Sequence, residues 1–289
     1  MSETLRYLYA ITDARAAALI AASEPRGIEG ASVEPLVEGP LLAATSVVPA
    51  SDYEEGPLNE HLQDLDWLAP RAAAHQDVNS KLLEITGAVL PLAFGAIYRG
   101  PDGVRSLLRS RAGELRDRLR SVEGRAEWIV SVERDQDLGG ATRPLRVRGP
   151  LPPGPLPLRP PAPDSEALRQ LDAEIVSAPP GRAFLLGKRR DEVLREERRA
   201  RDAAIAEETA AAVEAIGERV YREPLIDDPA ISAVARFSVL AGRGREAELG
   251  DAVRRLGATG ISRGYRVRLS GPWPAYRFGG LPREHATLA

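Results

Sequence analysis

A proline-rich interval in the middle of the chain is the feature that most constrains the fold. Residues 135–163 contain nine prolines, several glycines and no sustained hydrophobic periodicity. Such a composition favours a semi-rigid connection over a helix or a strand. The 289 residues also exceed the usual size of one domain. The sequence therefore predicts two domains, residues 1–134 and 164–289, joined by a linker at 135–163.

The first half mixes strand-like alternation with helical stripes. Thr12 and Asp13 supply a helix cap after the first strand, and Pro70 is expected to divide two helices. The predicted strands of this half are 5–11, 33–37, 41–48, 88–94 and 126–132. Its predicted helices lie between Asp13 and Ala22, around Leu58 to Leu65, from Pro70 to Ile85, and from Asp102 to Val122.

The second half repeats this alternation of strands and helices. Its predicted helices are 165–176, 188–216 and 244–256, and its predicted strands are 219–226, 231–240 and 265–269. The order in each half is close to βαββαβ, the split ferredoxin-like plan. We expect an α+β protein of two domains, each an antiparallel sheet with helices packed on one face.

The long helix at 188–216 carries charges of alternating sign and few large apolar residues. A stripe this thin is typical of a helix that is mostly solvated or that leans on a partner. Charge pairs three or four residues apart stabilise a helix by only about 0.2–0.5 kcal/mol each. The helix is therefore either a self-stabilised exposed helix or a docking arm for another protein.

An aromatic strap, residues 271–278, follows the last predicted strand. Its prolines fix φ and favour an extended course, from which Trp273, Tyr276 and Phe278 project. Only 5% of the chain is aromatic, so three rings in six positions are a concentration. The rings either cap the core of the last domain or form a partner-binding surface.

Composition limits the classes of function. The chain has no cysteine, which excludes disulfides, thiolate catalysis and cysteine-ligated metals. No secretory signal or membrane-spanning run is visible, so we expect a cytoplasmic protein. The net charge is −3, and only two of the 39 basic residues are lysines. Because so much arginine indicates a compositional bias, arginine clusters are weak support for nucleic-acid binding, and we expect neither nucleic acid nor membrane as a partner.

Three features of the sequence bear on catalysis, metal binding or cofactor binding. Residues 242–247 fit G-x-G-x-x-A, but no acidic residue lies between Arg254 and Phe278 to bind a ribose. His75 is followed four residues later by Asn79, a poor zinc ligand, so we expect a histidine hydrogen-bonded to a carboxylate. No G-x-S-x-G elbow occurs. We therefore predict no catalytic residue, no metal and no cofactor, and a protein that is not an enzyme.

A cluster of arginines is a further candidate binding site. Six arginines crowd the outer face of one predicted helix and could bind phosphates if they were unpaired, but Glu114 and Asp117 interrupt them. We expect a solvated face. The arginines are Arg105, Arg109, Arg111, Arg116, Arg118 and Arg120.

Several ordered blocks of the sequence resemble one known family. The ending Gly271-Pro272-Trp273-Pro274-Ala275-Tyr276 is similar to the Gly-Pro-Trp-Pro-Pro-Tyr-like ending of the gas vesicle protein F/L family. The earlier blocks that resemble the family are 7–11, 41–48, 66–68 with 74–75, and 89–95. The chain departs from the family at Ala93, often arginine, and at Ala275, usually proline. The resemblance covers nearly the whole chain except residues 135–163.

This resemblance implies an accessory protein needed for formation of the gas-filled shell that makes cells buoyant. Its implied partners are the hydrophobic shell protein and other accessory proteins, and it implies that such a protein can remain in the vesicle as a minor shell component. It also implies a fold of two α+β domains with ferredoxin-like portions. The alternative is a ligand-sensing regulatory module, because small ferredoxin-like domains often bind metabolites. The sequence leaves the oligomeric state and the shell-contacting surface open.

Overall fold

The computed structural model describes residues 4–134, 165–225, 232–262 and 264–281. Contacts between residues divide the chain into two compact units. Unit 1 comprises Met1–Trp128, Leu240–Glu246 and Ser270–Ala289, and unit 2 comprises Ile129–Val239 and Ala247–Leu269. The chain thus contributes three separate segments to unit 1, whereas the predicted domain boundaries follow chain order. The predicted linker at 135–163 lies outside the described residues.

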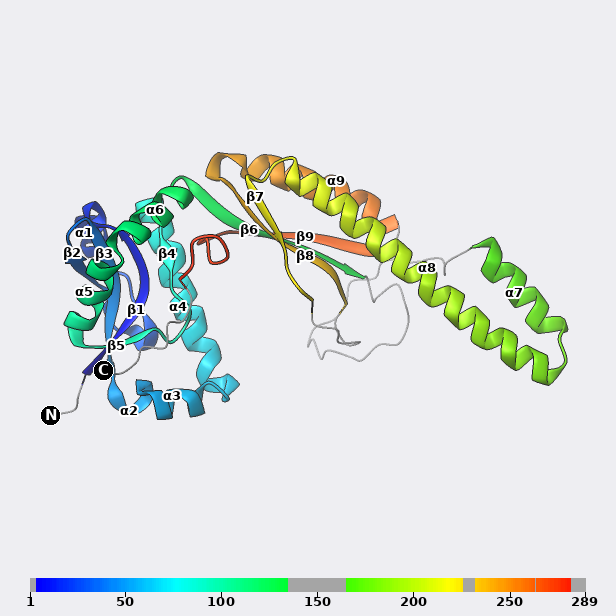
Figure 1. The fold of residues 1–289 in the computed structure, drawn as a ribbon, viewed down its shortest axis with the longest axis horizontal. Helices are drawn as coiled ribbons and strands as arrows, with labels where there is room; N and C mark the ends of the chain where they lie inside the picture. Colours follow the sequence, from blue (N-terminus) through cyan, green and yellow to red (C-terminus); the bar gives the residue numbers. More distant parts are fainter. Residues whose placement is uncertain (1–3, 135–164, 226–231, 263, 282–289) are drawn as a thin grey trace, which may run out of the picture. The chain divides into compact units, whose positions relative to one another are not determined.

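Unit 1 is built on an antiparallel sheet with the strand order β2-β3-β1-β4, in which β5 also pairs with β1. The long central strand β1 binds β3 along its whole length, with a register shift between Leu8 and Ala10. Both β4 and β5 pair with the other edge of β1 (Figure 1). The strands are β1 (Thr4–Asp13), β2 (Glu34–Glu38), β3 (Leu41–Pro49), β4 (Leu90–Pro91) and β5 (Ile97–Arg99).

Helices cover both faces of this sheet, rather than the single face expected. Successive residues of a strand point to opposite faces. Leu8 packs into a core with Val104 and Leu108 of α5, whereas Tyr7 lies against His75 of α4. The helices of unit 1 are α1 (Ala17–Ser23), α2 (Ala50–Tyr53), α3 (Glu55–His61), α4 (Leu65–Thr86), α5 (Gly100–Ser110) and α6 (Ala112–Val122), with short 3₁₀ turns at Ala14–Ala16, Ile28–Gly30 and Arg243–Arg245.

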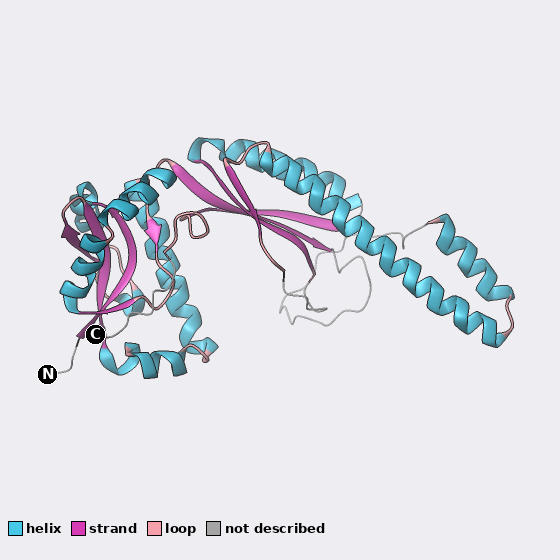
Figure 2. Ribbon diagram, viewed as in Figure 1, coloured by secondary structure: helices cyan, strands magenta, loops and turns pink. Residues whose placement is uncertain are grey.

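Unit 2 contains most of a second antiparallel sheet with the order β7-β8-β6-β9. Three of its strands, β6, β8 and β9, have residues in both units. Its strands are β6 (Arg125–Arg134), β7 (Arg219–Arg222), β8 (Ala233–Gly242) and β9 (Tyr265–Trp273), and its helices are α7 (Glu166–Ser177), α8 (Pro180–Glu214) and α9 (Glu246–Ser262) (Figure 2). The antiparallel sheets with packed helices confirm the predicted α+β class, and the ferredoxin-like plan stays a prediction.

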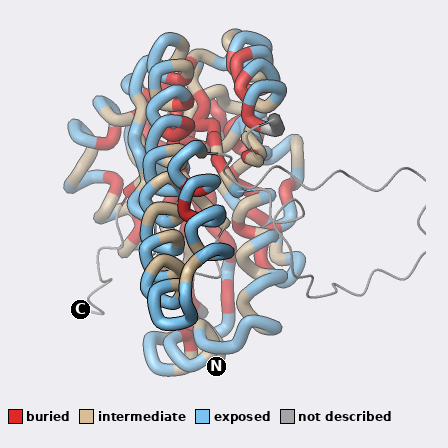
Figure 3. The backbone as a smooth tube through the Cα atoms, turned by 90° about the vertical axis from the view of Figure 1, so that its right-hand side faces the viewer, coloured by how far each residue is buried: buried red, intermediate tan, exposed pale blue. Residues whose placement is uncertain are grey.

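Helix α8 is 35 residues long, but its buried residues are confined to its C-terminal third. They are Ile205, Ala206, Thr209 and Val213. The preceding part of α8 pairs with α7 as a helical hairpin whose backbone is largely exposed or intermediate in burial (Figure 3). Two buried leucines of α7, Leu168 and Leu171, contribute to this hairpin. The predicted start at Lys188 is wrong, because α8 begins at Pro180.

Candidate partner-binding surfaces

The aromatic strap belongs to unit 1, whose last segment begins at Ser270. Its first residues complete β9, and the chain then turns, with the amide of Gly279 donating to the carbonyl of Ala275 over 2.7 Å. Gly271 has a φ of +134°, and a Cβ there would lie 2.9 Å from the carbonyl oxygen of Glu127. Glycine is therefore required at position 271, where the strap passes Glu127 of β6. Ala275 is 3% exposed and packs in the core of unit 1.

The three predicted partner-binding residues have different surroundings. Tyr276 is half-buried, its hydroxyl accepts a 2.9 Å hydrogen bond from Nδ2 of Asn79, and burial raises its pKa to about 12. Phe278 packs against the core of unit 1. Trp273 is also half-buried, and its Nε1 donates to the Ser270 hydroxyl over 3.3 Å. Tyr276 and Phe278 thus contribute to packing, and their partner-binding role stays a prediction.

Further hydrogen bonds hold the end of the strap to unit 1. The amide of Arg277 donates to a carboxylate oxygen of Glu127 over 2.8 Å, and Glu127 is only 4% exposed. The amide of Leu281 donates to the carbonyl of Pro91 over 3.2 Å, beside a parallel bridge between Leu92 and Leu281. The segment 274–281 is therefore an integral part of this unit.

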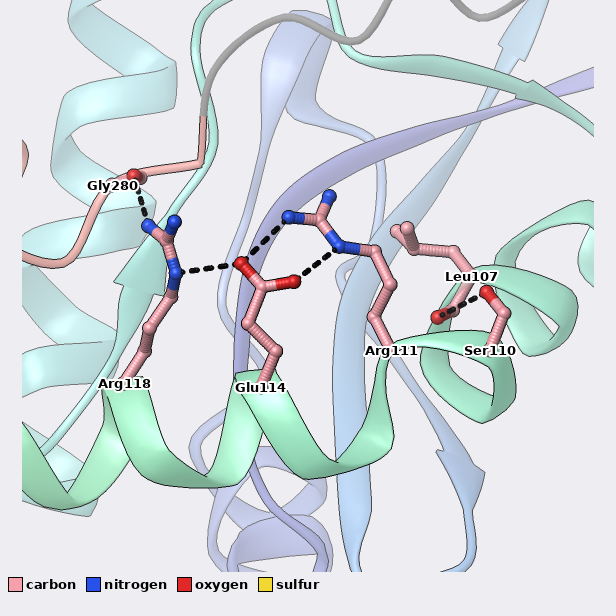
Figure 4. A network of polar contacts seen from close by, with 6 residues as sticks. All are labelled: Leu107, Ser110, Arg111, Glu114, Arg118 and Gly280. Atoms are coloured by element: carbon pink, nitrogen blue, oxygen red, sulfur yellow. Dashed lines mark hydrogen bonds and ion pairs between the residues drawn. The ribbon is translucent and has the colours of Figure 1, made fainter.

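A polar network on α6 also reaches this segment (Figure 4). Glu114 accepts hydrogen bonds from Arg111 and Arg118, and Arg118 donates to the carbonyl of Gly280 over 3.2 Å. These arginines, Arg111 foremost, lower the pKa of Glu114. Of the six arginines that crowd this region, five form ion pairs with acidic side chains, which are Arg105, Arg109, Arg111, Arg118 and Arg120. These ion pairs fit the predicted solvated face, because arginines paired with carboxylates are not available to bind phosphates.

A buried polar cluster lies on the face of the unit 1 sheet that α4 covers, opposite the face that packs against α5. His75 is 4% exposed, with Nδ1 2.8 Å from the Tyr7 hydroxyl and Nε2 3.2 Å from the carbonyl oxygen of Leu92 and 2.9 Å from Nδ2 of Asn79. Phe94 meets the imidazole edge to face. Burial lowers the pKa of His75 to about 4, so the ring is neutral at pH 7. The predicted carboxylate partner is wrong, because tertiary packing brings these residues to His75 instead.

The remaining sequence candidates have ordinary structural surroundings. Residues 243–245 form a 3₁₀ turn between β8 and α9, and the amide of Arg243 donates to the carbonyl of Gly124 over 3.0 Å. His61 stacks on Trp67 with ring centroids 4.6 Å apart. Among the described residues, no three His, Asp or Glu side chains are grouped to hold a metal ion, and none of the helices has the length and apolar character needed to cross a membrane.

An apolar surface that the sequence reasoning missed lies where α7 turns into α8. Val176, Phe184 and Leu185 are 88%, 64% and 65% exposed, and we call these three residues the hairpin tip. The signal was present in the sequence as the apolar run 183–186 after Pro179-Pro180-Gly181. Periodicity does not decide whether residues 183–187 form a strand or the start of a helix, so the sequence alone does not predict their exposure.

Comparison with known families identifies the chain. The model of the family described as gas vesicle synthesis protein GvpL/GvpF matches residues 5–279. The chain belongs to this family. It is 40% identical over 134 residues to gas vesicle protein L of Streptomyces sp. (strain CB03234), a match covering 45% of this chain and 48% of that protein. It is also 28% identical over 285 residues to gas vesicle protein L2 of Halobacterium salinarum, covering 94% and 90% of the two chains.

Two solved structures of GvpF share the fold. The crystal structure of gas vesicle protein GvpF from Anabaena sp. PCC7120 matches with a TM-score of 0.69 and 15% identity, over 96% of this chain and 99% of that one. GvpF from Microcystis aeruginosa matches with a TM-score of 0.60 and 15% identity, over 97% and 100%. At this identity the likeness shows the fold alone. The family match makes the chain a gas vesicle-related protein.

Proposed function

We propose that this chain is an accessory protein of gas vesicle formation that works in the cytoplasm by binding shell subunits and other accessory proteins, and that it catalyses no reaction. The family match over residues 5–279 supplies the gas vesicle context. The observation that carries the binding role is the hairpin tip, where three large apolar side chains lie exposed within ten residues. Contiguous exposed apolar surface marks sites of protein interaction.

The physical rationale concerns the shell subunits before they assemble. A subunit destined for a closed protein shell exposes apolar surface that aggregates unless another protein covers it. An accessory protein with an apolar surface on a stable scaffold can hold such a subunit and release it to the growing shell. The strap offers a second contact through Trp273, since Tyr276 and Phe278 are engaged with unit 1.

Co-expression with the gas vesicle shell protein of the same organism tests this proposal. The tagged full chain is captured, and the shell protein recovered with it is quantified. We expect stoichiometric recovery from the wild type and at least a threefold loss with Trp273→Ala. Tyr221→Ala, which removes a side chain 41% exposed in unit 2, is the matched control and should retain binding.

Tyr276, also in the strap, gives a separate readout. Tyr276→Ala removes a ring that is hydrogen-bonded to Asn79, and we expect it to lower thermal stability. Failure of the wild-type chain to recover any shell protein, with the chain folded, would refute the proposal.

A further inference from the structure

We infer that one corner of unit 1 is a docking surface for a partner protein that presents an amphipathic helix bordered by lysine or arginine side chains. This acidic corner comprises α2, α3 and the first two turns of α4, residues 50–72 (Figure 1). The inference rests on the proposed role as a binding protein and adds the chemistry of one partner. Its support is an uncovered helix face, an excess of negative charge and a packed aromatic base.

The first half of α4 leaves an apolar face uncovered. The buried residues of this helix all lie from His75 onward. Four apolar residues before His75 follow the spacing i, i+3, i+4, i+7, which places them on one helix face, and none of them is buried. Such a face is a surface on which a second helix can pack. The four residues are Leu65, which is 75% exposed, Leu68, Ala69 and Ala72.

Negative charge borders this face. Residues 50–70 contain six carboxylates and no lysine or arginine, although the net charge of the whole chain is only −3. One of the six caps α4 by accepting hydrogen bonds from two amides at its start. None of the six forms an ion pair within the described residues. The carboxylates belong to Asp52, Glu54, Glu55, Glu60, Asp64 and Asp66.

The neighbouring elements do not neutralise this charge. On α4, the first lysine or arginine after Arg71 is Lys81, which lies ten positions on and therefore roughly 15 Å along the helix axis. The elements that contact α2 and α4 supply four other arginines or partners of them, and two of these arginines are already paired. Even if the other two are counted against the six carboxylates, four negative charges remain. The paired arginines are Arg6, with Glu34, and Arg71, with Glu29, and the other two are Arg26 and Arg99.

Aromatic rings hold the three helices of the corner together. Trp67 of α4 lies with its ring centroid 5.7 Å from that of Tyr53 of α2. His61 of α3 stacks on the same tryptophan with ring centroids 4.6 Å apart. The guanidinium of Arg71 lies 4.1 Å from the centre of the tryptophan ring. The surface is therefore preorganised, which lowers the cost of ordering it when a partner binds.

The sign of the charge selects the class of partner. Nucleic acids and anionic bilayers carry charge of the same sign as the corner and are repelled by it. Within the described part of the chain, no three His, Asp or Glu side chains are grouped to hold a metal ion. A helix with an apolar stripe bordered by basic side chains complements both the uncovered face and the carboxylates. A basic amphipathic helix of another polypeptide is thus the best match.

The experiment measures binding of the full chain to a synthetic helix of leucine and lysine. The peptide has about 18 residues with leucine on one face and carries a fluorophore, so that fluorescence anisotropy reports its Kd. The same peptide with glutamate in place of lysine is the control probe. One variant of the chain combines Glu55→Gln, Glu60→Gln and Asp66→Asn, and a second carries Leu65→Ser. All four side chains are exposed.

Each variant has a matched control elsewhere in the chain. Glu174→Gln, Glu192→Gln and Glu196→Gln together remove three exposed carboxylates from unit 2. Leu19→Ser changes a leucine that is 54% exposed on α1. Circular dichroism checks that every variant is folded.

We expect the Kd for the lysine peptide to rise about tenfold in the triple corner variant and about threefold in Leu65→Ser, because charge and apolar contact are lost separately. Both controls should stay within about twofold of the wild type. Binding should weaken as NaCl rises from about 0.05 to 0.5 M. Amide hydrogen exchange of residues 50–72 should slow when the peptide is bound.

Several results would overturn the inference. They are absence of binding by the wild type, equal binding of the glutamate peptide, and an unchanged Kd in either corner variant. Calcium chloride alone, if it bound the wild type in calorimetry but not the triple corner variant, would assign the corner to a metal ion and overturn the inference as well. Capture of the shell protein is a separate readout. A wild type that binds the lysine peptide as expected but recovers no shell protein would refute the proposed function and leave this inference standing.

Discussion

Acid should weaken unit 1 through His75. The imidazole is 4% exposed among Tyr7, Phe94 and Asn79, and burial lowers its pKa from the ordinary 6.5 to about 4. The unfolded chain regains the ordinary pKa. Because the unfolded state binds the proton at a higher pH than the folded state, the contribution of neutral His75 to stability is fully present above pH 6.5. This contribution is lost as the pH falls from about 6.5 to about 4.

The size of this loss follows from the two pKa values of His75. At pH 4.5 nearly all unfolded molecules, but only about a quarter of folded ones, would carry the proton. One pKa unit corresponds to about 1.36 kcal/mol, so the free energy of unfolding should fall by about 2.5 kcal/mol between pH 7.5 and pH 4.5. Domains are stable by roughly 5–15 kcal/mol, so this loss is readily measured.

The three tryptophans make the measurement specific to unit 1. Trp67, Trp128 and Trp273 all belong to that unit. Urea unfolding is followed by tryptophan fluorescence at pH 7.5 and 4.5, in the wild type and in His75→Gln, whose side chain stays neutral. Other acid-sensitive groups act equally in both proteins, so the difference between them isolates His75. Parallel pH dependence in the two proteins, within about 0.5 kcal/mol, would refute the reasoning.

Two further predictions concern the strap and unit 2. A Cβ at Gly280 would lie 2.2 Å from the carbonyl oxygen of Tyr276, so Gly280→Ala should cost about 1–3 kcal/mol in the same fluorescence assay. Gly113→Ala, on α6 with no neighbouring atom within 4 Å, should instead stabilise by roughly 0.5–1 kcal/mol; the reverse order of the two variants would contradict this account. In unit 2, Asp202→Asn weakens the 2.6 Å ion pair with Arg134, and amide hydrogen exchange in β6 and α8 should accelerate. Unchanged exchange would show that the pair adds nothing to stability.

Local patterns predicted the elements whose sequence signals act over a few residues. Alternation at 5–11 indicated β1, which spans Thr4–Asp13, and Ser165 caps α7 by accepting from the amide of Leu168 over 3.1 Å. The boundary predicted at Pro70 is wrong. Asp64 caps α4 by accepting from the amides of Asp66 and Trp67, and the helix continues through the proline. A strong cap thus decided the start of this helix more than the proline did.

The placement of the strap required information that no local pattern holds. Tyr276 and Asn79 are hydrogen-bonded although 197 positions separate them. The same applies to His75, whose neighbours in space come from β1 and the segment after β4. Spacing along the sequence suggested carboxylate partners for His75, because a helical pattern indicates only which residues three or four positions away lie on the same face of the helix. Long-range packing decides such contacts. The sequence therefore indicated that the strap is rich in aromatic residues, but it did not indicate where the strap packs.

The hairpin tip shows a different limit. The apolar run at 183–186 was visible, but periodicity does not tell a short buried strand from an exposed helix start. Only the neighbours of Phe184 and Leu185 in space distinguish these cases. Because exposed apolar side chains are costly to leave uncovered, their exposure is the feature that connects the fold with the proposed function.

Vesicle formation in living cells tests the central claim most directly. The gene is deleted from the host genome, and cells are complemented with the wild type or with the variant combining Phe184→Asp and Leu185→Asp. Vesicles are then counted by electron microscopy at equal protein levels. We predict no vesicles in the deletion, normal numbers with the wild type, and a strong reduction with the variant. Normal vesicles in the deleted strain would contradict the proposed role in gas vesicle formation.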